Sequence, residues 1–203
     1  MADPDIELLV AWRAGDRQAG GTLLDRHFAA VRRFFRTKVG DDHEDLVQRT
    51  FTRCVEVQVR FRAEGSFRSY LFAIAHNVLR EHLRVRRRDA RVEPDSESVA
   101  DLGLPGPSTF AAARREQQLL LQALRRLPIN DQIVLELFYW ESMTSAEISA
   151  VLDLPDATIR TRLRSARQRL RGFIDELARD VRERQSTIDG FDHWVGELRE
   201  HLG

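Results

Sequence analysis

Apolar side chains recur at helical spacing along most of the chain, and no segment shows the strict alternation typical of a half-buried strand. Residues 41–57 begin with a group of carboxylates, which favours a helix N-terminus there. One side of this predicted helix carries an apolar stripe formed by Val47, Phe51, Cys54 and Val55. Because a helix with such a stripe packs that side against a core, we predict that these side chains are buried.

A second helix is predicted over residues 67–88, after a short break at Gly65. Ser66 precedes it and is a candidate N-cap. Its apolar side is formed by Phe67, Leu71, Ile74, Ala75 and Val78, and its polar side by Asn77, Arg80, Arg84, Arg87 and Arg88. The polar side ends in consecutive arginines with no acidic residue among them. Because like charges at this spacing destabilise a helix, the pattern favours a face that a polyanion neutralises over a merely solvated one.

Residues 144–171 predict two helices joined by a tight turn. Thr144 and Glu147 have the spacing of a capping box, and Pro155 or Asp156 opens the second helix. That helix has an apolar stripe of Ile159, Leu163, Ala166 and Leu170 beside a cationic stripe of Arg160, Arg164, Arg167 and Arg171. This is the layout of a helix-turn-helix, whose second helix fits the major groove of DNA. A surface amphipathic helix without a ligand is the alternative.

A stretch rich in proline, glycine and serine divides the chain into two helical blocks. Residues 92–110 contain three prolines and no basic side chain, which is typical of a flexible acidic linker. We therefore predict an all-α protein with two small helical domains at residues 1–92 and 114–175. The linker is residues 93–113, and residues 176–203 form a short acidic helical extension. This extension either packs on its own domain or acts as a regulatory segment.

Composition and charge narrow the range of possible functions further. The formal net charge is zero, yet residues 1–93 and 114–174 are mildly basic and the segments that follow them are acidic. Cys54 is the only cysteine, so an intramolecular disulfide is excluded and a reducing cytoplasm is expected. No apolar run is long enough to span a membrane, and the acidic N-terminus is unlike a signal peptide. We find no metal-ligand spacing, phosphate-binding loop or catalytic set, so neither a cofactor nor an enzymatic activity is expected.

Three segments resemble, in order, those of the extracytoplasmic-function sigma factors of bacterial RNA polymerase, in the sigma-70 family. "EDLVQRTF" is similar to the polymerase-docking segment, and "FRAEGSFRSYLFAIAHNVLREHLRVRRR" is similar to the segment that reads the −10 element. "LRRLPINDQIVLELFYWESMTSAEISAVLDLPDATIRTRLRSARQRL" looks like the segment that reads the −35 element. The chain departs from the family pattern at Tyr70, where tryptophan is common, and at Asp153 and Ala157, where glycines are common.

The resemblance implies a protein that directs core polymerase to promoters, with roles for particular residues. The implied polymerase contacts are Asp45, Leu46 and Gln48. The implied −10 contacts are Phe61, Arg62, Ser66, Phe67, Tyr70, Asn77, Arg80, Arg84, Arg87 and Arg88. The implied −35 contacts are Thr158, Arg160, Thr161, Arg164, Arg167 and Arg171. The implied partners are bacterial core RNA polymerase and promoter DNA, together with an anti-sigma factor or other regulator.

A conventional helix-turn-helix regulator, which binds operator DNA without polymerase, is the main rival. The first block argues against it, because such a regulator has no use for "EDLVQ" or for the arginine-faced helix that follows. An adaptor that binds polymerase but has lost DNA binding is a further alternative, and the arginine stripe on the second block argues against it.

Overall fold

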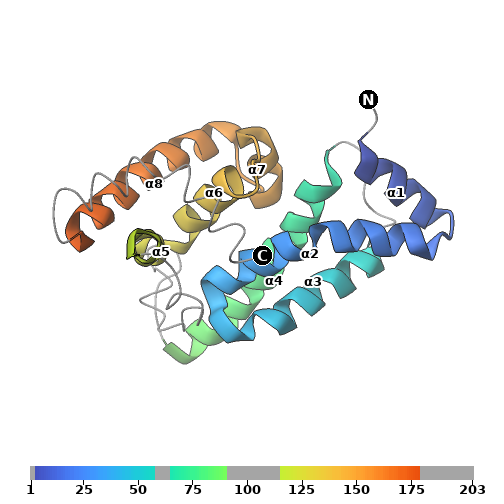
Figure 1. Ribbon diagram of the computed structural model, residues 1–203, viewed down its shortest axis with the longest axis horizontal. Coiled ribbons are helices and arrows are strands. Elements are labelled where there is room, and N and C mark those ends of the chain that lie inside the picture. Colours follow the sequence, from blue (N-terminus) through green and yellow to red (C-terminus); the bar gives the residue numbers. More distant parts are fainter. Residues whose placement is uncertain (1–2, 58–64, 91–114, 179–203) are drawn as a thin grey trace.

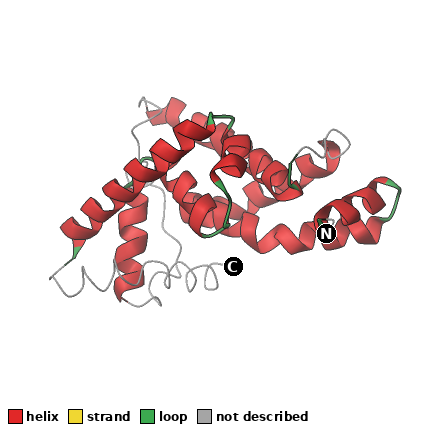
Figure 2. Ribbon diagram, turned by 90° about the horizontal axis from the view of Figure 1, so that it is seen from above, coloured by secondary structure: helices red, strands yellow, loops and turns green. Residues whose placement is uncertain are grey.

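The computed structural model describes residues 3–57, 65–90 and 115–178. These residues form two groups of α-helices that lie side by side, and in the described ranges the helices are joined by short turns (Figures 1 and 2). The predicted all-α fold with two small helical domains is confirmed. The linker and most of the C-terminal extension lie outside the described residues.

The first domain contains α1 (Pro4–Arg13), α2 (Arg17–Val39), a short 3-10 turn (Gly40–Asp42), α3 (His43–Val57) and α4 (Phe67–Ala90). Asp16 caps α2, because its carboxylate accepts from the backbone N–H groups of Gln18 and Ala19 at 2.9 and 3.0 Å. The long helix α2 packs against α1, α3 and α4, and its buried aromatic side chains meet those of α4. This packing fixes the relative positions of α3 and α4, which carry the predicted polymerase and −10 residues.

The apolar stripe of α3 is buried only in part. Val47 and Cys54 lie in the core, and burial raises the pKa of the Cys54 thiol to about 12. Val55, however, is 46% exposed, so the prediction that it is buried was wrong. The periodicity placed Val55 at the edge of the stripe, and that edge lies on the surface beside Phe28 of α2 instead of under a neighbouring helix.

The second domain contains α5 (Arg115–Arg126), α6 (Ile129–Tyr139), α7 (Ser145–Leu152) and α8 (Asp156–Leu177). The capping box is present: the Thr144 hydroxyl accepts from the Glu147 N–H at 3.2 Å, and the Thr144 N–H donates to the Glu147 carboxylate at 2.8 Å. Asp153 ends α7 in the left-handed region (φ 53°), a conformation that aspartate tolerates better than most residues. The apolar stripe predicted for α8 is buried along its length. The helix-turn-helix is therefore confirmed as a fold.

The two domains are in direct contact. Helix α4 of the first domain lies against α7 of the second, and the end of α2 lies near the turn that follows α6. In the part of the chain that the structure describes, none of the helices combines the length and the apolar character that crossing a membrane requires.

Candidate functional site

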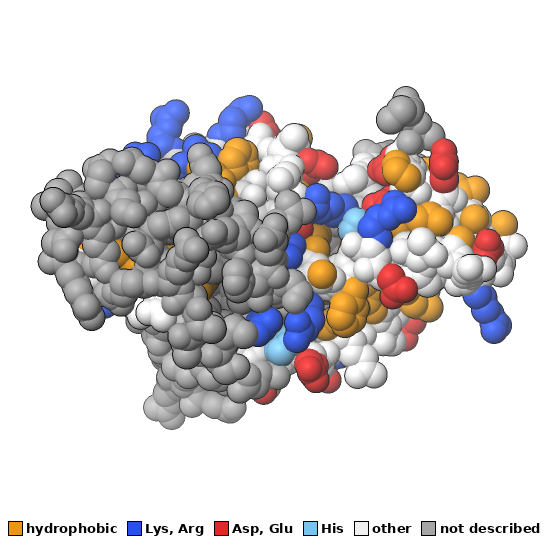
Figure 3. Space-filling view, in the orientation of Figure 1, with side chains coloured by type: hydrophobic (Ala, Val, Ile, Leu, Met, Phe, Trp, Pro, Cys, Tyr) orange, Lys and Arg blue, Asp and Glu red, His pale blue; other side chains and the backbone are white. Residues whose placement is uncertain are grey.

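Helix α8 presents a row of polar side chains on the surface opposite its buried stripe. Thr158, Arg160, Thr161, Arg164 and Arg171 are exposed, which contact with a ligand requires. Arg160 forms an ion pair with Asp156 one turn earlier, at 2.7 Å, and the Thr161 hydroxyl donates to the Ala157 carbonyl at 3.0 Å. Figure 3 shows basic side chains projecting over α8. The helix can therefore offer guanidinium groups to an anionic partner without unpacking its core.

Arg167 differs from its neighbours in the cationic stripe. Its guanidinium carbon lies 5.0 Å from the centre of the Phe138 ring and 5.3 Å from that of Tyr139. Such cation–π contacts hold the side chain against α6. Arg167 is thus a half-buried brace between α6 and α8, with less freedom than Arg160 or Arg164 to reach a base edge.

Two further arginines of α8, off the predicted stripe, make contacts that the sequence did not indicate. Arg169 forms an ion pair with the buried carboxylate of Asp131 on α6. Arg162 lines a cavity toward the first domain. On the helix wheel both flank the apolar stripe on the side away from the cationic stripe, and the packing of α8 against its neighbours decides their role.

The polar face of α4 lines a cavity between the two domains. Asn77, Arg80 and Arg84 are exposed and border this cavity, which has a volume of about 1080 Å³. On the same side, Glu81 accepts from Arg53 of α3 at 2.7 and 3.0 Å. This hydrogen bond lowers the pKa of the Glu81 carboxyl group. The ion pair ties α3 to α4 and leaves Arg80 and Arg84 as cationic groups on the face.

The structure corrects the prediction that Phe67 contacts the −10 element. Its side chain is fully buried in the core of the first domain, so it supports α4 and cannot contact DNA. Tyr70 is half-buried, and its ring centre lies 6.4 Å from that of Phe67. The Ser66 hydroxyl accepts from the Ser69 N–H at 3.1 Å, as expected of an N-cap. Four predicted contacts are not described: Phe61 and Arg62 lie outside the described residues, and the same holds for the side chains of Arg87 and Arg88.

A second concave surface lies between α2 and α3, with a volume of about 560 Å³. We call it the α2–α3 groove; its lining includes Phe28, His43, Val47, Gln48, Phe51 and Val55. The rings of Phe28 and Phe51 are stacked with their centres 5.7 Å apart, although Phe28 is 48% exposed. Hydrophobic side chains are visible on the surface over α2 and α3 in Figure 3. The exposed Phe28 ring, stacked on the partly buried Phe51 and next to the exposed Val55, forms an apolar surface patch, a feature typical of protein-binding surfaces.

The predicted polymerase contacts lie along or near this groove, with one exception. Asp45 and Gln48 are exposed on α3. Leu46 is only 1% exposed and packs in the core, so its prediction as a polymerase contact was wrong. Successive helical residues point in different directions, and Leu46 faces inward where Asp45 faces outward. Phe28 was missed because nothing on α2 alone marks it as exposed.

Within the described residues we find no group of three or more histidine, cysteine, aspartate or glutamate side chains able to hold a metal ion. The exposed side chains described above are guanidinium groups on α4 and α8 and an apolar groove with carboxylates nearby.

Comparisons with known proteins agree with this arrangement. The family described as sigma-70 region 2 matches residues 23–89, and that described as sigma-70 region 4 matches residues 117–170. RNA polymerase sigma factor CnrH of Cupriavidus metallidurans is 30% identical over 183 residues, which cover 85% of this chain and 95% of CnrH. The ECF RNA polymerase sigma-E factor of Escherichia coli is 25% identical over 184 residues, which cover 86% of this chain and 96% of that protein.

Solved structures show the same architecture. CnrH in complex with the cytosolic domain of CnrY superimposes with a TM-score of 0.62 at 26% identity, covering 86% of this chain and 99% of that one. RpoE in complex with the anti-sigma factor NepR from Bartonella quintana has a TM-score of 0.61 at 21% identity, covering 76% of this chain and 96% of that one. At this identity, the likeness supports the fold alone.

The chain belongs to the sigma-70 family and, within it, to the extracytoplasmic-function RNA polymerase sigma factors. Members of this family are transcription initiation factors that bind RNA polymerase and promoter DNA, and they are not enzymes. The alternative of a conventional regulator that acts without polymerase gains no support from these comparisons.

Proposed function

We propose that the two domains of this sigma factor divide promoter recognition between them. The first, residues 1–92, docks on core polymerase and reads the −10 element, and the second, residues 114–175, reads the −35 element. The observation that carries the proposal is the exposed cationic row on α8, the second helix of a capped helix-turn-helix whose apolar stripe is buried. In such motifs the second helix enters the major groove, where arginine binds guanine edges and phosphates.

On the second domain, Thr158, Arg160, Thr161 and Arg164 occupy the first half of α8 and would contact base edges. Arg171 lies two turns beyond Arg164 and would contact the phosphate backbone. Arg167 would act beside it from its position against Phe138 and Tyr139. The exposure of the first four side chains supports this assignment.

On the first domain, Asn77, Arg80 and Arg84 would line the path of the −10 strand along α4, continued by Arg87 and Arg88. Ser66 and Tyr70, together with Phe61 and Arg62, would hold an unstacked base at the start of the helix. Extruding a base costs a few kcal/mol, and stacking on an aromatic ring offsets part of that cost. The exposed cationic face of α4 supports this proposal.

For polymerase docking, Asp45 and Gln48 would contact the basic coiled coil of the polymerase clamp. The α2–α3 groove would receive apolar side chains of the same partner. Carboxylates next to the exposed Phe28 ring suit a surface that is basic and amphipathic.

Other parts of the proposal follow from family membership. The sigma factor would work where bacterial core polymerase works, in the cytoplasm, and would have no catalytic activity or cofactor of its own. Because CnrH was solved with CnrY, and RpoE with NepR, we extend to this chain an anti-sigma factor as regulatory partner. The acidic extension at residues 176–203 remains a candidate regulatory segment.

The test is a transcription assay with the double variant Arg160→Ala/Arg164→Ala. A promoter is first selected from a library with the wild-type protein and core polymerase, and a second template carries a scrambled −35 element. Each base contact contributes about 1–3 kcal/mol, so we expect the double variant to lose at least about tenfold in output on the selected promoter. On the scrambled template, wild type and variant should give the same low output.

Arg126→Ala is the matched control, because it removes an arginine of the same domain that lies outside the cationic row of α8. In the wild type this arginine forms an ion pair with Glu176 at 3.3 Å. Circular dichroism verifies that each variant is folded. If the double variant transcribes the selected promoter as well as wild type and Arg126→Ala do, α8 does not read the −35 element.

A further inference from the structure

The cavity between the two domains has room for a small organic molecule. One of its walls belongs to α3 and α4, and the other to the start of α6, the end of α7 with the turn that follows it, and α8. Its volume is about 1080 Å³. Pockets that hold small ligands measure roughly 300–1000 Å³, so size alone admits a nucleotide, and the chemistry of the lining decides which ligand suits it.

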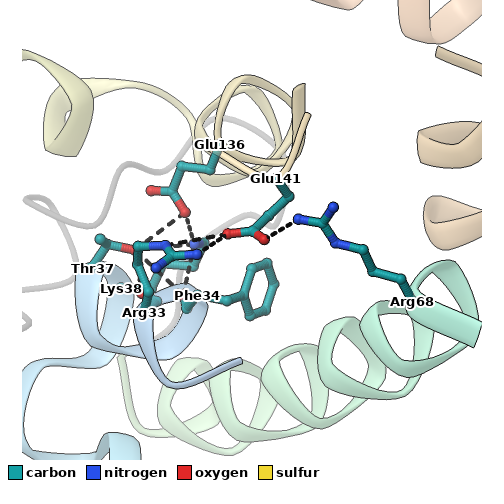
Figure 4. Close-up of polar contacts among 7 residues, drawn as sticks. All are labelled: Arg33, Phe34, Thr37, Lys38, Arg68, Glu136 and Glu141. Atoms are coloured by element: carbon teal, nitrogen blue, oxygen red, sulfur yellow. Dashed lines mark hydrogen bonds and ion pairs between the residues drawn. The ribbon is translucent and has the colours of Figure 1, made fainter. Parts of the chain in front are cut away.

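Buried ion pairs fix the position of one wall relative to the other. Arg33 and Arg68 of the first domain both pair with Glu141, in the turn after α6 (Figure 4). Lys38 of the first domain pairs with Glu136 of α6. Because such charge-assisted hydrogen bonds are stronger than neutral ones, side chains from both walls can act together on one ligand.

Three guanidinium groups line the cavity without an ion-pair partner among the described residues. Arg80 and Arg84 lie one turn apart on α4, and Arg162 lies on α8 in the opposite wall. A fourth arginine of the lining, Arg53, is engaged by Glu81 at 2.7 and 3.0 Å. The hydrogen bond from Arg53, and after it the charge of Arg84, lower the pKa of the Glu81 carboxyl group. Both walls can therefore offer guanidinium groups to an anion.

The charge balance limits how much negative charge the cavity accepts. Its lining carries four arginines and three carboxylates, the latter being Glu56, Glu81 and Asp153. Glu56 and Asp153 are exposed and would repel additional negative charge. A ligand with one phosphate group therefore suits the cavity better than a polyphosphate.

Apolar side chains from both domains share this lining. Ile74 of α4, Leu152 at the end of α7 and Leu154 in the following turn are half-buried, and each leaves part of its surface uncovered. Covering apolar surface is favourable. A flat ring placed against these side chains would be stabilised in this way.

Neutral polar groups stand on the same wall as Arg80. The imidazole of His76 is neutral, because burial, followed by the charges of Arg80 and Lys38, lowers its pKa to about 4. Asn77, its neighbour on α4, is exposed and also lines the cavity. A neutral imidazole and an amide can each donate and accept hydrogen bonds, which is what the edge of a heterocyclic base requires.

We propose that the cavity between the domains binds a nucleoside monophosphate, with the phosphate held by guanidinium groups of both walls and the base against the apolar side chains. Arginine suits this role because its planar fork binds phosphate through two parallel hydrogen bonds. Arg80 and Arg84 are also proposed −10 contacts, so the nucleotide and the −10 strand would exclude each other. That consequence rests on the proposed function, whereas the site itself does not.

The experiment titrates the full-length protein with AMP, GMP, CMP and UMP in a calorimeter. Each nucleoside without its phosphate, and inorganic phosphate alone, are titrated in parallel. We expect at least one of the four nucleotides to bind at a single site with a Kd below about 1 mM. Its nucleoside and inorganic phosphate should bind at least about tenfold more weakly, because each makes only part of the contacts. The proposal is overturned if none of the four nucleotides binds saturably, or if inorganic phosphate binds as tightly as the nucleotide.

Two variants remove one guanidinium group from each wall. Arg80→Ala and Arg162→Ala should each weaken nucleotide binding at least about tenfold, the loss expected for hydrogen bonds to a charged group. The control is Arg126→Ala, whose arginine pairs with Glu176 outside the cavity, and it should bind the nucleotide as wild type does. Circular dichroism verifies that each variant is folded. Wild-type affinity in both cavity variants would show that the nucleotide binds elsewhere and that the assignment is wrong.

A nucleotide within single-stranded DNA offers the same phosphate and base, so a −10 oligonucleotide is measured with the same proteins. A strand that follows α4 would use Arg80 but not α8, and we expect Arg162→Ala to weaken the free nucleotide and to leave the oligonucleotide unaffected. If Arg162→Ala weakens both equally, the cavity belongs to the path of the DNA and the assignment to a free nucleotide is overturned. If the nucleotide binds as expected but wild-type holoenzyme reads no promoter, the proposed function fails and the nucleotide site stands.

Discussion

His76 makes the stability of this sigma factor depend on pH. Its side chain is buried in α4, and burial, followed by the positive charges of Arg80 and Lys38, lowers the pKa of the imidazole to about 4. An unfolded chain exposes the same group to water, where its pKa is about 6.5. Between about pH 4 and pH 6.5, His76 is therefore protonated in the unfolded chain and neutral in the folded protein.

The sign and the size of the pH effect on stability follow from this difference in the pKa of His76. Stability falls as pH decreases wherever the unfolded state binds more protons. The contribution of His76 is therefore fully present above about pH 6.5, is lost progressively as the pH falls toward 4, and changes no further below that. Each pKa unit corresponds to about 1.4 kcal/mol, so the full loss is about 3 kcal/mol, of which about 2 kcal/mol falls between pH 7 and pH 5.

The assay is urea unfolding of wild type and His76→Gln, followed by circular dichroism at several pH values from 7 to 5. Glutamine fills much of the same space and does not titrate, while the other titrating groups are shared by both proteins. We expect the free energy of unfolding of wild type to fall by about 2 kcal/mol more than that of the variant. Parallel pH profiles for the two proteins would refute the buried, neutral state of His76.

Adjacent glycines of α2 should respond in opposite directions to alanine. A Cβ at Gly20 would lie 2.6 Å from the Trp12 ring, whereas one at Gly21 would meet no atom within 4 Å. In thermal unfolding, Gly20→Ala should lose about 1 kcal/mol or more, because crowding outweighs the helix propensity gained, and Gly21→Ala should gain about 0.5–1 kcal/mol. Equal shifts would contradict the close packing of α1 on α2. Thr144→Ala, which breaks the capping box with Glu147, should cost about 1 kcal/mol in urea unfolding; an unchanged midpoint would show that the cap contributes nothing.

Local features of the sequence predicted local features of the structure. The capping box at Thr144, the start of α8 at Asp156 and its buried stripe follow from spacings of a few residues, so they could be deduced from the sequence alone. The exposure of Arg160 and Arg164 followed in the same way, because a helix that buries one side must expose the other.

The errors share a physical cause. Periodicity shows which side chains share a helix face, but it does not show how far a neighbouring helix covers that face. Leu46 and Phe67 were assigned to partners and lie in the core, whereas Val55 was assigned to the core and lies on the surface. The pairing of Lys38 with Glu136 joins positions far apart in sequence, and only packing of the two domains could reveal it.

The central claim is that this chain is a promoter-reading subunit of bacterial RNA polymerase, and the most direct measurement is transcription of a random promoter library. Purified chain is mixed with core polymerase, and the transcript starts are sequenced alongside a reaction with core polymerase alone. We expect the chain to bind the core enzyme and to produce transcripts from templates that share two upstream elements at fixed spacing. Failure to bind core polymerase, or a set of starts identical to that of core polymerase alone, would contradict the account.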